Sequence, residues 1–240
     1  HRVDRRQRQM CIRDSAGTAS WTDPTLMACG RFYPPHANSA EARLRFYASR
    51  FGLAEVDSSY YALPSAENAY LWAQRTPDDF VFNIKAYRLF TGHQTPLTAL
   101  PADIRQELGD WPEPVIYHRG MPDDLRDELW RRYTLALEPL RMADKLGAVH
   151  FQFPPWVQRD ARGMALVADC VRRLEDHLVS VEFRHRSWFA TPAATAATLA
   201  MERELGVVHT VVDAPQGFDN SVPAVWLSLI HISEPTRLLS

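Results

Sequence analysis

Hydrophobic and polar positions in this 240-residue chain alternate between short strand-like runs and longer helix-like runs. The strand-like runs are rich in Val, Phe and Tyr, and the longer runs place apolar residues three or four positions apart. The predicted strands are 17–21, 53–61, 80–87, 148–153, 178–184 and 207–213, and the predicted helices are 39–52, 65–76, 123–147, 160–176 and 192–206. Six strands alternating with helices predict an α/β fold with a parallel sheet covered by helices.

Capping residues and glycines set the predicted helix boundaries. Ser39 and Ser65 are good N-caps, and Gly147 and Gly206 are good helix stops. Pro139 lies inside the longest predicted helix, and we expect it to kink or divide that helix because proline removes a backbone hydrogen bond.

The polar positions within the strands distinguish two parallel-sheet topologies, an open doubly wound sheet and a closed (β/α)8 barrel. The central strands of an open sheet are covered on both faces and read as continuous apolar runs. Here alternate positions stay polar, in the pairs Glu55 and Asp57, Asn83 and Lys85, His150 and Gln152, Glu182 and Arg184, and His209 and Asp213. One polar side per strand fits side chains that point toward a barrel axis. The glycine-rich phosphate turn of a dinucleotide-binding sheet is also missing from the sequence. We therefore predict a TIM-type (β/α)8 barrel.

Five motifs, in order along the chain, carry a resemblance to a known family. They are GTASW, EVDSSYYALPS, FVFNIKA, KLGAVHFQFPP and VEFRHRSW. Together they resemble the YecE-like family, domain of unknown function 72 (DUF72), over residues 17–223. The resemblance implies a TIM-type barrel, a cytoplasmic location and a bacterial or archaeal source, and it implies no activity. Family members continue past the VDAPQGF-like stretch, so we expect about six of the eight β/α units here, an incomplete barrel.

The two ends of the chain read as translated nucleotide adapters. Residues 5–14 and 227–237 back-translate into transposase-type sequencing adapters, and the first codons of the second segment are the reverse complement of the element that encodes the end of the first, so 1–15 and 227–240 are read as adapter-derived. We expect neither end to belong to the fold. The expected organisation is thus a single barrel-like domain over 16–226.

Composition and charge narrow the class of protein. With 46% hydrophobic and 23% charged residues the chain is an ordinary globular protein, and it lacks an apolar run long enough to cross a membrane. Residues 16–226 carry 21 basic and 26 acidic side chains, which argues weakly against broad binding to a phosphate backbone. Cys29 and Cys170 show no paired-ligand spacing, so disulfides and cysteine zinc sites are not expected, and a reducing cytoplasm fits.

Candidate functional residues gather at the C-terminal ends of the predicted strands, where TIM-barrel enzymes place their active sites. The candidate catalytic residues are Asp57, Lys85, Glu182 and Asp213. The candidate substrate-binding residues are Trp21, Tyr60, Arg88, Gln152, Arg184, His185 and Trp188. Carboxylates and a desolvated lysine can carry protons, the planar guanidinium of arginine can hold an anion, and aromatic rings can stack on a sugar or base.

Each assignment has a structural alternative that the sequence leaves open. Lys85 can form an ion pair inside the barrel with Asp57 or Glu182, and Arg184 can pair with a neighbouring acid. The aromatic residues can pack beneath loops, and His150 can be a hydrogen-bonded core residue. The cofactor is unknown. A divalent metal on Glu182, His185, Asp57 and Asp213 is possible but not favoured, because no metal-binding signature fixes their spacing.

Three classes of function follow from these residues. We favour an enzyme, a hydrolase, lyase or isomerase, acting on a small polar or anionic substrate such as a sugar or phosphorylated metabolite. The alternatives are a nucleic-acid-acting or nucleic-acid-binding barrel, which the acidic balance does not favour, and a non-catalytic interaction scaffold. The long stretch 88–121, rich in Pro, Gly and His, is a candidate lid or binding loop. The oligomeric state is left open.

Overall fold

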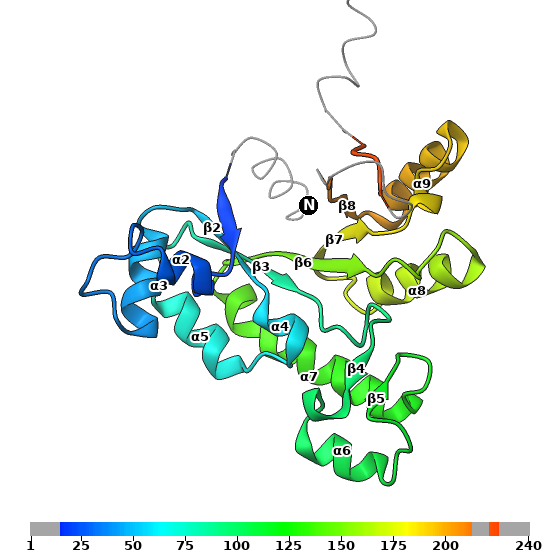
Figure 1. Cartoon of the computed structure of the whole chain (residues 1–240), viewed down its shortest axis with the longest axis horizontal. Helices are drawn as coiled ribbons and strands as arrows, with labels where there is room; N and C mark the ends of the chain where they lie inside the picture. Colours follow the sequence, from blue (N-terminus) through cyan, green and yellow to red (C-terminus); the bar gives the residue numbers. More distant parts are fainter. Residues whose placement is uncertain (1–14, 213–220, 226–240) are drawn as a thin grey trace, which may run out of the picture. The chain divides into compact units, whose positions relative to one another are not determined.

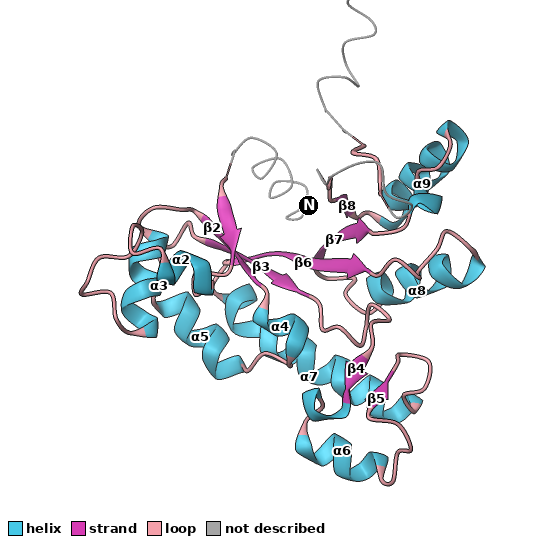
Figure 2. Cartoon of the chain, in the orientation of Figure 1, coloured by secondary structure: helices cyan, strands magenta, loops and turns pink. Residues whose placement is uncertain are grey.

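The computed structural model describes residues 15–212 and 221–225. Strands and helices alternate along most of this chain (Figures 1 and 2). The strands are β1 (Gly17–Ala19), β2 (Leu53–Val56), β3 (Val81–Lys85), β4 (Thr95–Pro96), β5 (Val115–Ile116), β6 (Leu146–Phe153), β7 (Leu178–Phe183) and β8 (Val208–His209). The helices are α2 (Pro24–Ala28), α3 (Ala40–Ala48), α4 (Ser58–Tyr61), α5 (Ala66–Gln74), α6 (Ala102–Leu108), α7 (Asp123–Met142), α8 (Ala161–Arg172) and α9 (Pro192–Leu205), with 3-10 turns η1 (Leu97–Ala99) and η2 (Arg186–Trp188).

Six of the described strands form one sheet, in the order β1-β2-β3-β6-β7-β8. The pairs β1/β2, β2/β3 and β7/β8 are parallel, and the register sets Val56 opposite Ile84 and Val181 opposite His209. Strands β4 and β5 form a separate antiparallel pair. The other six strands lie in the sheet in the same order as in the chain. The predicted α/β fold with a parallel sheet is confirmed. No helix of the described residues is long and apolar enough to cross a membrane.

Contacts divide the chain into two compact units, each with its own aromatic core. The described part of the first unit comprises 15–85 and 127–148, and that of the second comprises 86–126, 149–212 and 221–225. In the first unit Phe82 of β3 is fully buried against Trp21 and Trp72 of α5. In the second unit Phe183 of β7 stacks on Trp188, with ring centroids 3.9 Å apart. Such aromatic pairs add about 0.5–1.5 kcal/mol beyond the burial of their surface.

The predicted N-caps begin their helices as expected. The hydroxyl of Ser39 accepts a hydrogen bond from the Ala42 amide, and the hydroxyl of Ser65 accepts one from the Asn68 amide. Gly206 ends α9 in the left-handed conformation, with φ 69°. The polar pattern therefore located the helix starts correctly.

Two predicted elements are corrected by the structure. The strand predicted over 53–61 ends at Val56, and α4 follows it, because the Ser59 hydroxyl turns the chain by bonding back to the Val56 carbonyl at 2.7 Å. Helix α7 continues through Pro139 undivided and ends at Met142. Gly147 is not its stop but lies in β6, where a Cβ atom would sit 2.3 Å from Oδ1 of Asn83.

The segment predicted as a long loop, 88–121, contains elements of its own. It holds the β4–β5 pair, η1 and α6, which lie together in Figure 2. Its start is tied to the loop after β6, since the Trp156 indole N–H donates to the Gly92 carbonyl at 3.0 Å and the Trp156 ring meets the His93 ring edge to face. The segment is therefore a small folded insertion of the second unit.

Candidate functional site

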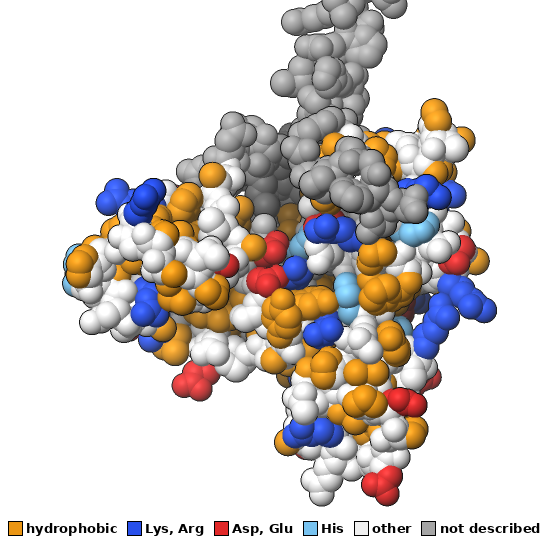
Figure 3. All heavy atoms as spheres, in the orientation of Figure 1, with side chains coloured by type: hydrophobic (Ala, Val, Ile, Leu, Met, Phe, Trp, Pro, Cys, Tyr) orange, Lys and Arg blue, Asp and Glu red, His pale blue; other side chains and the backbone are white. Residues whose placement is uncertain are grey.

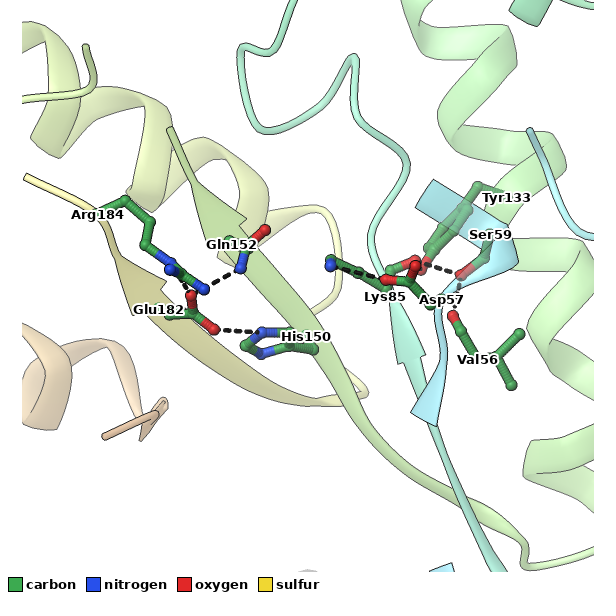
Figure 4. A network of polar contacts seen from close by, with 9 residues as sticks. All are labelled: Val56, Asp57, Ser59, Lys85, Tyr133, His150, Gln152, Glu182 and Arg184. Carbon is green, nitrogen blue, oxygen red and sulfur yellow. Dashed lines mark hydrogen bonds and ion pairs between the residues drawn. The ribbon is translucent and has the colours of Figure 1, made fainter. Parts of the chain in front are cut away.

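In the first unit the ends of β2 and β3 carry a lysine–carboxylate pair. Lys85 is the last residue of β3, and Asp57 directly follows β2. The parallel register places them opposite each other, and Nζ of Lys85 donates to Oδ1 of Asp57 at 2.7 Å (Figure 4). The ammonium also lies 5.2 Å from the centre of the Tyr60 ring, a favourable position for a cation beside an aromatic face. Three of the predicted site residues, Asp57, Tyr60 and Lys85, therefore lie together at this strand end.

The backbone beneath Lys85 is fixed by two buried hydroxyls. Ser59 Oγ lies 2.6 Å from the Lys85 carbonyl oxygen, and the hydroxyl of Tyr133 donates to the same oxygen at 3.3 Å. Burial raises the pKa of Tyr133 far above its usual value, so this hydroxyl stays protonated. The strand end that presents Lys85 is therefore held by side chains from α4 and α7.

In the second unit a polar network joins side chains on the same face of the neighbouring strands β6 and β7 (Figure 4). The carboxylate of Glu182 accepts hydrogen bonds from Gln152 Nε2 at 2.7 Å, from His150 Nε2 at 3.2 Å and from Arg184 Nε. Below it, His150 Nδ1 meets Ser180 Oγ at 3.0 Å. Residues two apart on a strand share a face, and this face of both strands is polar. Four protein groups thus converge on one carboxylate or on its histidine partner.

The network keeps Glu182 ionised although its side chain is buried. Burial alone would raise the pKa of this carboxyl group, but the hydrogen bonds from His150 and Gln152 and the charge of Arg184 outweigh it and lower the pKa to about 2. An ionised carboxylate only accepts hydrogen bonds, so His150 must carry a proton on Nε2. The ionised Glu182 therefore fixes the Nε2 proton of His150, whose Nδ1 lies 3.0 Å from Ser180 Oγ.

Arg184 extends from the network into solvent. Its side chain is 40% exposed, whereas that of Glu182 is 8% exposed. Its Nε bonds to Glu182, and among the described residues the two Nη groups have no recorded partner. A guanidinium held by one edge and open at the other can take an anion through its remaining N–H groups.

Other predicted site residues are occupied by protein contacts. Trp21 is 8% exposed and packs edge to face on Trp72 and Phe82. Trp188 is fully buried, and its indole N–H donates to the Val157 carbonyl at 2.9 Å. These observations favour the packing alternative for both rings.

His185 and Arg88 lie just past strand ends without joining the Glu182 network. Nδ1 of His185 accepts the amide proton of Ser187 at 3.1 Å and so caps η2. Arg88 is half-buried in the turn after β3, and its backbone carbonyl accepts the His93 amide. Asp213, the remaining candidate, lies outside the described residues.

Two members of the network were not candidates in the sequence. His150 was interpreted as a core histidine, and Ser180 was not considered. The available signal was the two-residue spacing, since Ser180 precedes Glu182 by two and His150 precedes Gln152 by two. The register between β6 and β7 decides which polar residues of the two strands contact each other. The sequence alone does not show this register.

The sequence left open a divalent metal on Glu182, His185, Asp57 and Asp213. Within residues 15–212 and 221–225, no group of three or more His, Cys, Asp or Glu side chains is arranged to hold a metal ion. Glu182 has its oxygens engaged by nitrogen donors, which leaves it poorly placed as a ligand.

A family model described as "Protein of unknown function DUF72" matches residues 15–237. The chain belongs to the DUF72 family. The resemblance seen in the five sequence motifs is thereby confirmed. The UPF0759 protein YunF of Bacillus subtilis (strain 168) is 34% identical over 209 residues, which make up 87% of this chain and 64% of that protein. This DUF72 chain therefore spans just under two thirds of the length of its curated relative.

Solved structures of DUF72 proteins share the fold. A crystal structure from Enterococcus faecalis V583 has a TM-score of 0.65 at 22% identity, covering 87% of this chain and 64% of that one. A crystal structure from Thermotoga maritima MSB8 has a TM-score of 0.59 at 22% identity, covering 87% and 68%. At this level of identity the likeness concerns the fold alone, and it confirms the TIM-type α/β assignment.

Proposed function

We propose that this chain is the larger part of an enzyme that acts on a small polar substrate carrying an anionic group, such as a phosphorylated sugar, and that Arg184 binds the anion. The observation that carries the proposal is the pairing of a half-exposed Arg184 with a buried, ionised Glu182 at the end of β7. Ligands of α/β proteins bind at the carboxyl ends of parallel strands, which is where Arg184 stands.

In this proposal Glu182 positions Arg184 rather than transferring a proton. A carboxyl group with a pKa of about 2 is ionised throughout the physiological range and too weak a base to take a proton from a substrate. It fixes the guanidinium in one orientation, and a pre-oriented arginine loses less entropy when it binds an anion. Gln152 and His150 hold the carboxylate in turn.

The Lys85–Asp57 pair is the proposed proton carrier of the first unit. An ammonium and a carboxylate 2.7 Å apart, neither fully buried, can pass a proton to or from a bound group without leaving an isolated charge. Asp213 keeps its proposed catalytic role from the sequence. The alternative is a purely structural ion pair, which would tolerate replacement of both residues by a neutral pair.

The face of the molecule drawn in Figure 3 bears on the nucleic-acid alternative. Within each unit, the Lys and Arg side chains on that face are interspersed with hydrophobic and acidic ones. A broad phosphate-backbone interface needs a continuous basic surface. This distribution supports a small anionic ligand over a nucleic acid strand.

The test is calorimetric binding of glucose 6-phosphate, glucose and inorganic phosphate to the chain and to Arg184→Gln. We expect the wild type to bind the sugar phosphate more tightly than glucose, and Arg184→Gln to weaken that binding at least tenfold. Removing one charge-assisted contact to an anion costs about 1.5–3 kcal/mol, which corresponds to this factor.

The control is Arg203→Gln, which removes an exposed arginine from α9 and should change nothing. Equal weakening by both variants would mean that only the overall charge matters, and the assignment of Arg184 would then be wrong. Binding of a DNA oligonucleotide that falls steeply with salt, with no binding of the sugar phosphate, would favour the nucleic-acid alternative instead.

A further inference from the structure

The second unit contains a cavity of about 980 Å³ that shares no residue with the Glu182 network. Its walls come from the turn after β5, the first turns of α7, the loop after β6 and one side of α8. Sites for small molecules in proteins span about 300–1,000 Å³, so a metabolite-sized ligand fits this volume. All of its lining residues belong to the same compact unit.

The cavity is basic. Four arginines line it against two carboxylates. Both carboxylates already have partners in the protein: Asp160 caps α8 by accepting the Gly163 amide at 2.8 Å, and Asp169 pairs with the guanidinium of Arg173 at 3.1 Å. Arg119 and Arg162, by contrast, make no recorded hydrogen bond or ion pair within the described part of the chain. The cavity therefore offers uncompensated positive charge to a ligand.

Two buried nitrogens in the cavity wall also have no recorded partner. Nε2 of His118 and Nε of Arg126 are inaccessible to solvent and have no hydrogen-bond partner among the described residues. Buried polar atoms are nearly always hydrogen-bonded, so each exception calls for an explanation such as a bound group. Burial and, to a lesser extent, the charge of the nearby Arg126 lower the pKa of His118 to about 4, so its imidazole is neutral at physiological pH.

Two large aromatic side chains in the wall are exposed. Trp156 is 57% exposed and Tyr117 is 46% exposed, although both are large hydrophobic residues. The Trp156 ring is held in place by its hydrogen bond to Gly92 and its edge contact with His93. A fixed, exposed indole is a stacking platform for a flat ring, and such stacking contributes about 1–3 kcal/mol per base.

We infer that this cavity is a binding site for a nucleoside phosphate, with the phosphate among the arginines and the base against Trp156. Three features of this one cavity support the inference: cations without a partner, buried nitrogens without a partner and an exposed aromatic ring. No simpler ligand would contact all three. A phosphate alone leaves the aromatic residues unused, and a neutral nucleoside leaves the cations unused. The site is separate from Arg184, so it does not depend on the proposed function.

The test is isothermal titration calorimetry of the whole chain with AMP, adenosine and inorganic phosphate in separate titrations. We expect AMP to bind at least tenfold more tightly than either adenosine or phosphate. Arg162→Gln should weaken AMP binding about tenfold and leave adenosine binding unchanged. Trp156→Ala should weaken both AMP and adenosine and leave phosphate unchanged. Because Arg162 is exposed and unpaired, its replacement should leave the thermal unfolding midpoint unaltered.

The matched control is Arg105→Gln, an exposed arginine of α6 in the same unit and outside the cavity wall, which should bind AMP like the wild type. Arg162→Gln should bind glucose 6-phosphate like the wild type, so that failure here and failure of the proposed function can be told apart. The inference is overturned if AMP does not bind at millimolar concentration, if phosphate binds as tightly as AMP, or if Arg162→Gln and Trp156→Ala bind AMP unchanged.

Discussion

At the scale of single residues, Glu182 links stability to pH. Its carboxyl pKa is about 2 in the folded chain, against an ordinary value of 4.5. A lowered folded pKa contributes stability that is complete above the unfolded value and is lost as the pH falls through the folded value. The contribution of Glu182 to the free energy of unfolding is therefore full above about pH 5 and disappears toward pH 2. Its size near neutral pH is of order 3 kcal/mol.

We expect Glu182→Gln to be less stable than the wild type by about 3 kcal/mol at pH 7, and this difference should shrink to less than half by pH 3. Urea unfolding at pH 3, 4, 5 and 7 measures both. The control is Glu128→Gln, because Glu128 also has a pKa lowered to about 2, by Arg131 and Arg132, but lies in an exposed pair that solvent screens. A difference for Glu182→Gln that stays constant over this pH range would contradict the lowered pKa.

The candidate site could be predicted in part at this scale. The two-residue alternation correctly indicated that Lys85 and Asp57 share a strand-end region, and that Glu182 and Arg184 share a face. It could not indicate that His150 is the partner of Glu182, because a single sequence carries no register between β6 and β7. The burial of Trp188 was equally hidden, since its stacking on Phe183 depends on how η2 folds back over its own strand.

At the scale of elements, a buried lysine caps the C-terminal end of α5. Lys145 is 4% exposed, and its Nζ donates to the carbonyl oxygens of Ala73 and Thr76 at 2.6 and 2.7 Å. Ala73 lies in the last turn of α5, where the carbonyls have no partner within the helix and mark the negative end of its dipole, and Thr76 lies just past the helix end. A single ammonium from the start of β6 thus ties α5 to the sheet of the first unit.

Lys145→Met should lower the free energy of unfolding by about 2–4 kcal/mol, because it leaves two buried carbonyl groups without their charged donor. Denaturant unfolding measures the loss, and far-ultraviolet circular dichroism tests whether helix is lost with it. Arg75→Gln is the control at the same helix end: its ion pair with Glu41 is partly exposed to solvent, and its loss should cost less than about 1 kcal/mol. Equal effects of the two substitutions would show that Lys145 is not a cap.

The elements themselves were more predictable than their ends. Hydrophobic periodicity and caps such as Ser39 and Ser65 located the helices because these signals are local. The end of β2 was missed because the Ser59 hydroxyl, a side-chain hydrogen bond to the backbone, overrides the β-propensity of the tyrosines that follow. Gly147 was misinterpreted as a helix stop. A glycine is required at this position because Asn83, on another strand, leaves no room for a side chain, and this tertiary contact cannot be seen in the sequence.

At the scale of the whole molecule, the contacts fall into two compact units, and each has its own aromatic core. Phe82 is buried in the first core and Phe183 in the second. Regions that open together are those that share dense contacts, so amide exchange should follow these two units. We therefore expect a cavity in one core to loosen mainly that unit.

Phe82→Ala and Phe183→Ala make a matched pair for this prediction, since each removes a fully buried ring at a cost of about 3–5 kcal/mol. Hydrogen-exchange mass spectrometry should show at least hundredfold faster exchange in α3, α5 and β2 for Phe82→Ala, with α8 and β7 changed much less. Phe183→Ala should give the reverse pattern. Equal acceleration of both sets of peptides in both variants would mean that the chain unfolds as one cooperative body, and the division into two units would then describe contact density without describing stability.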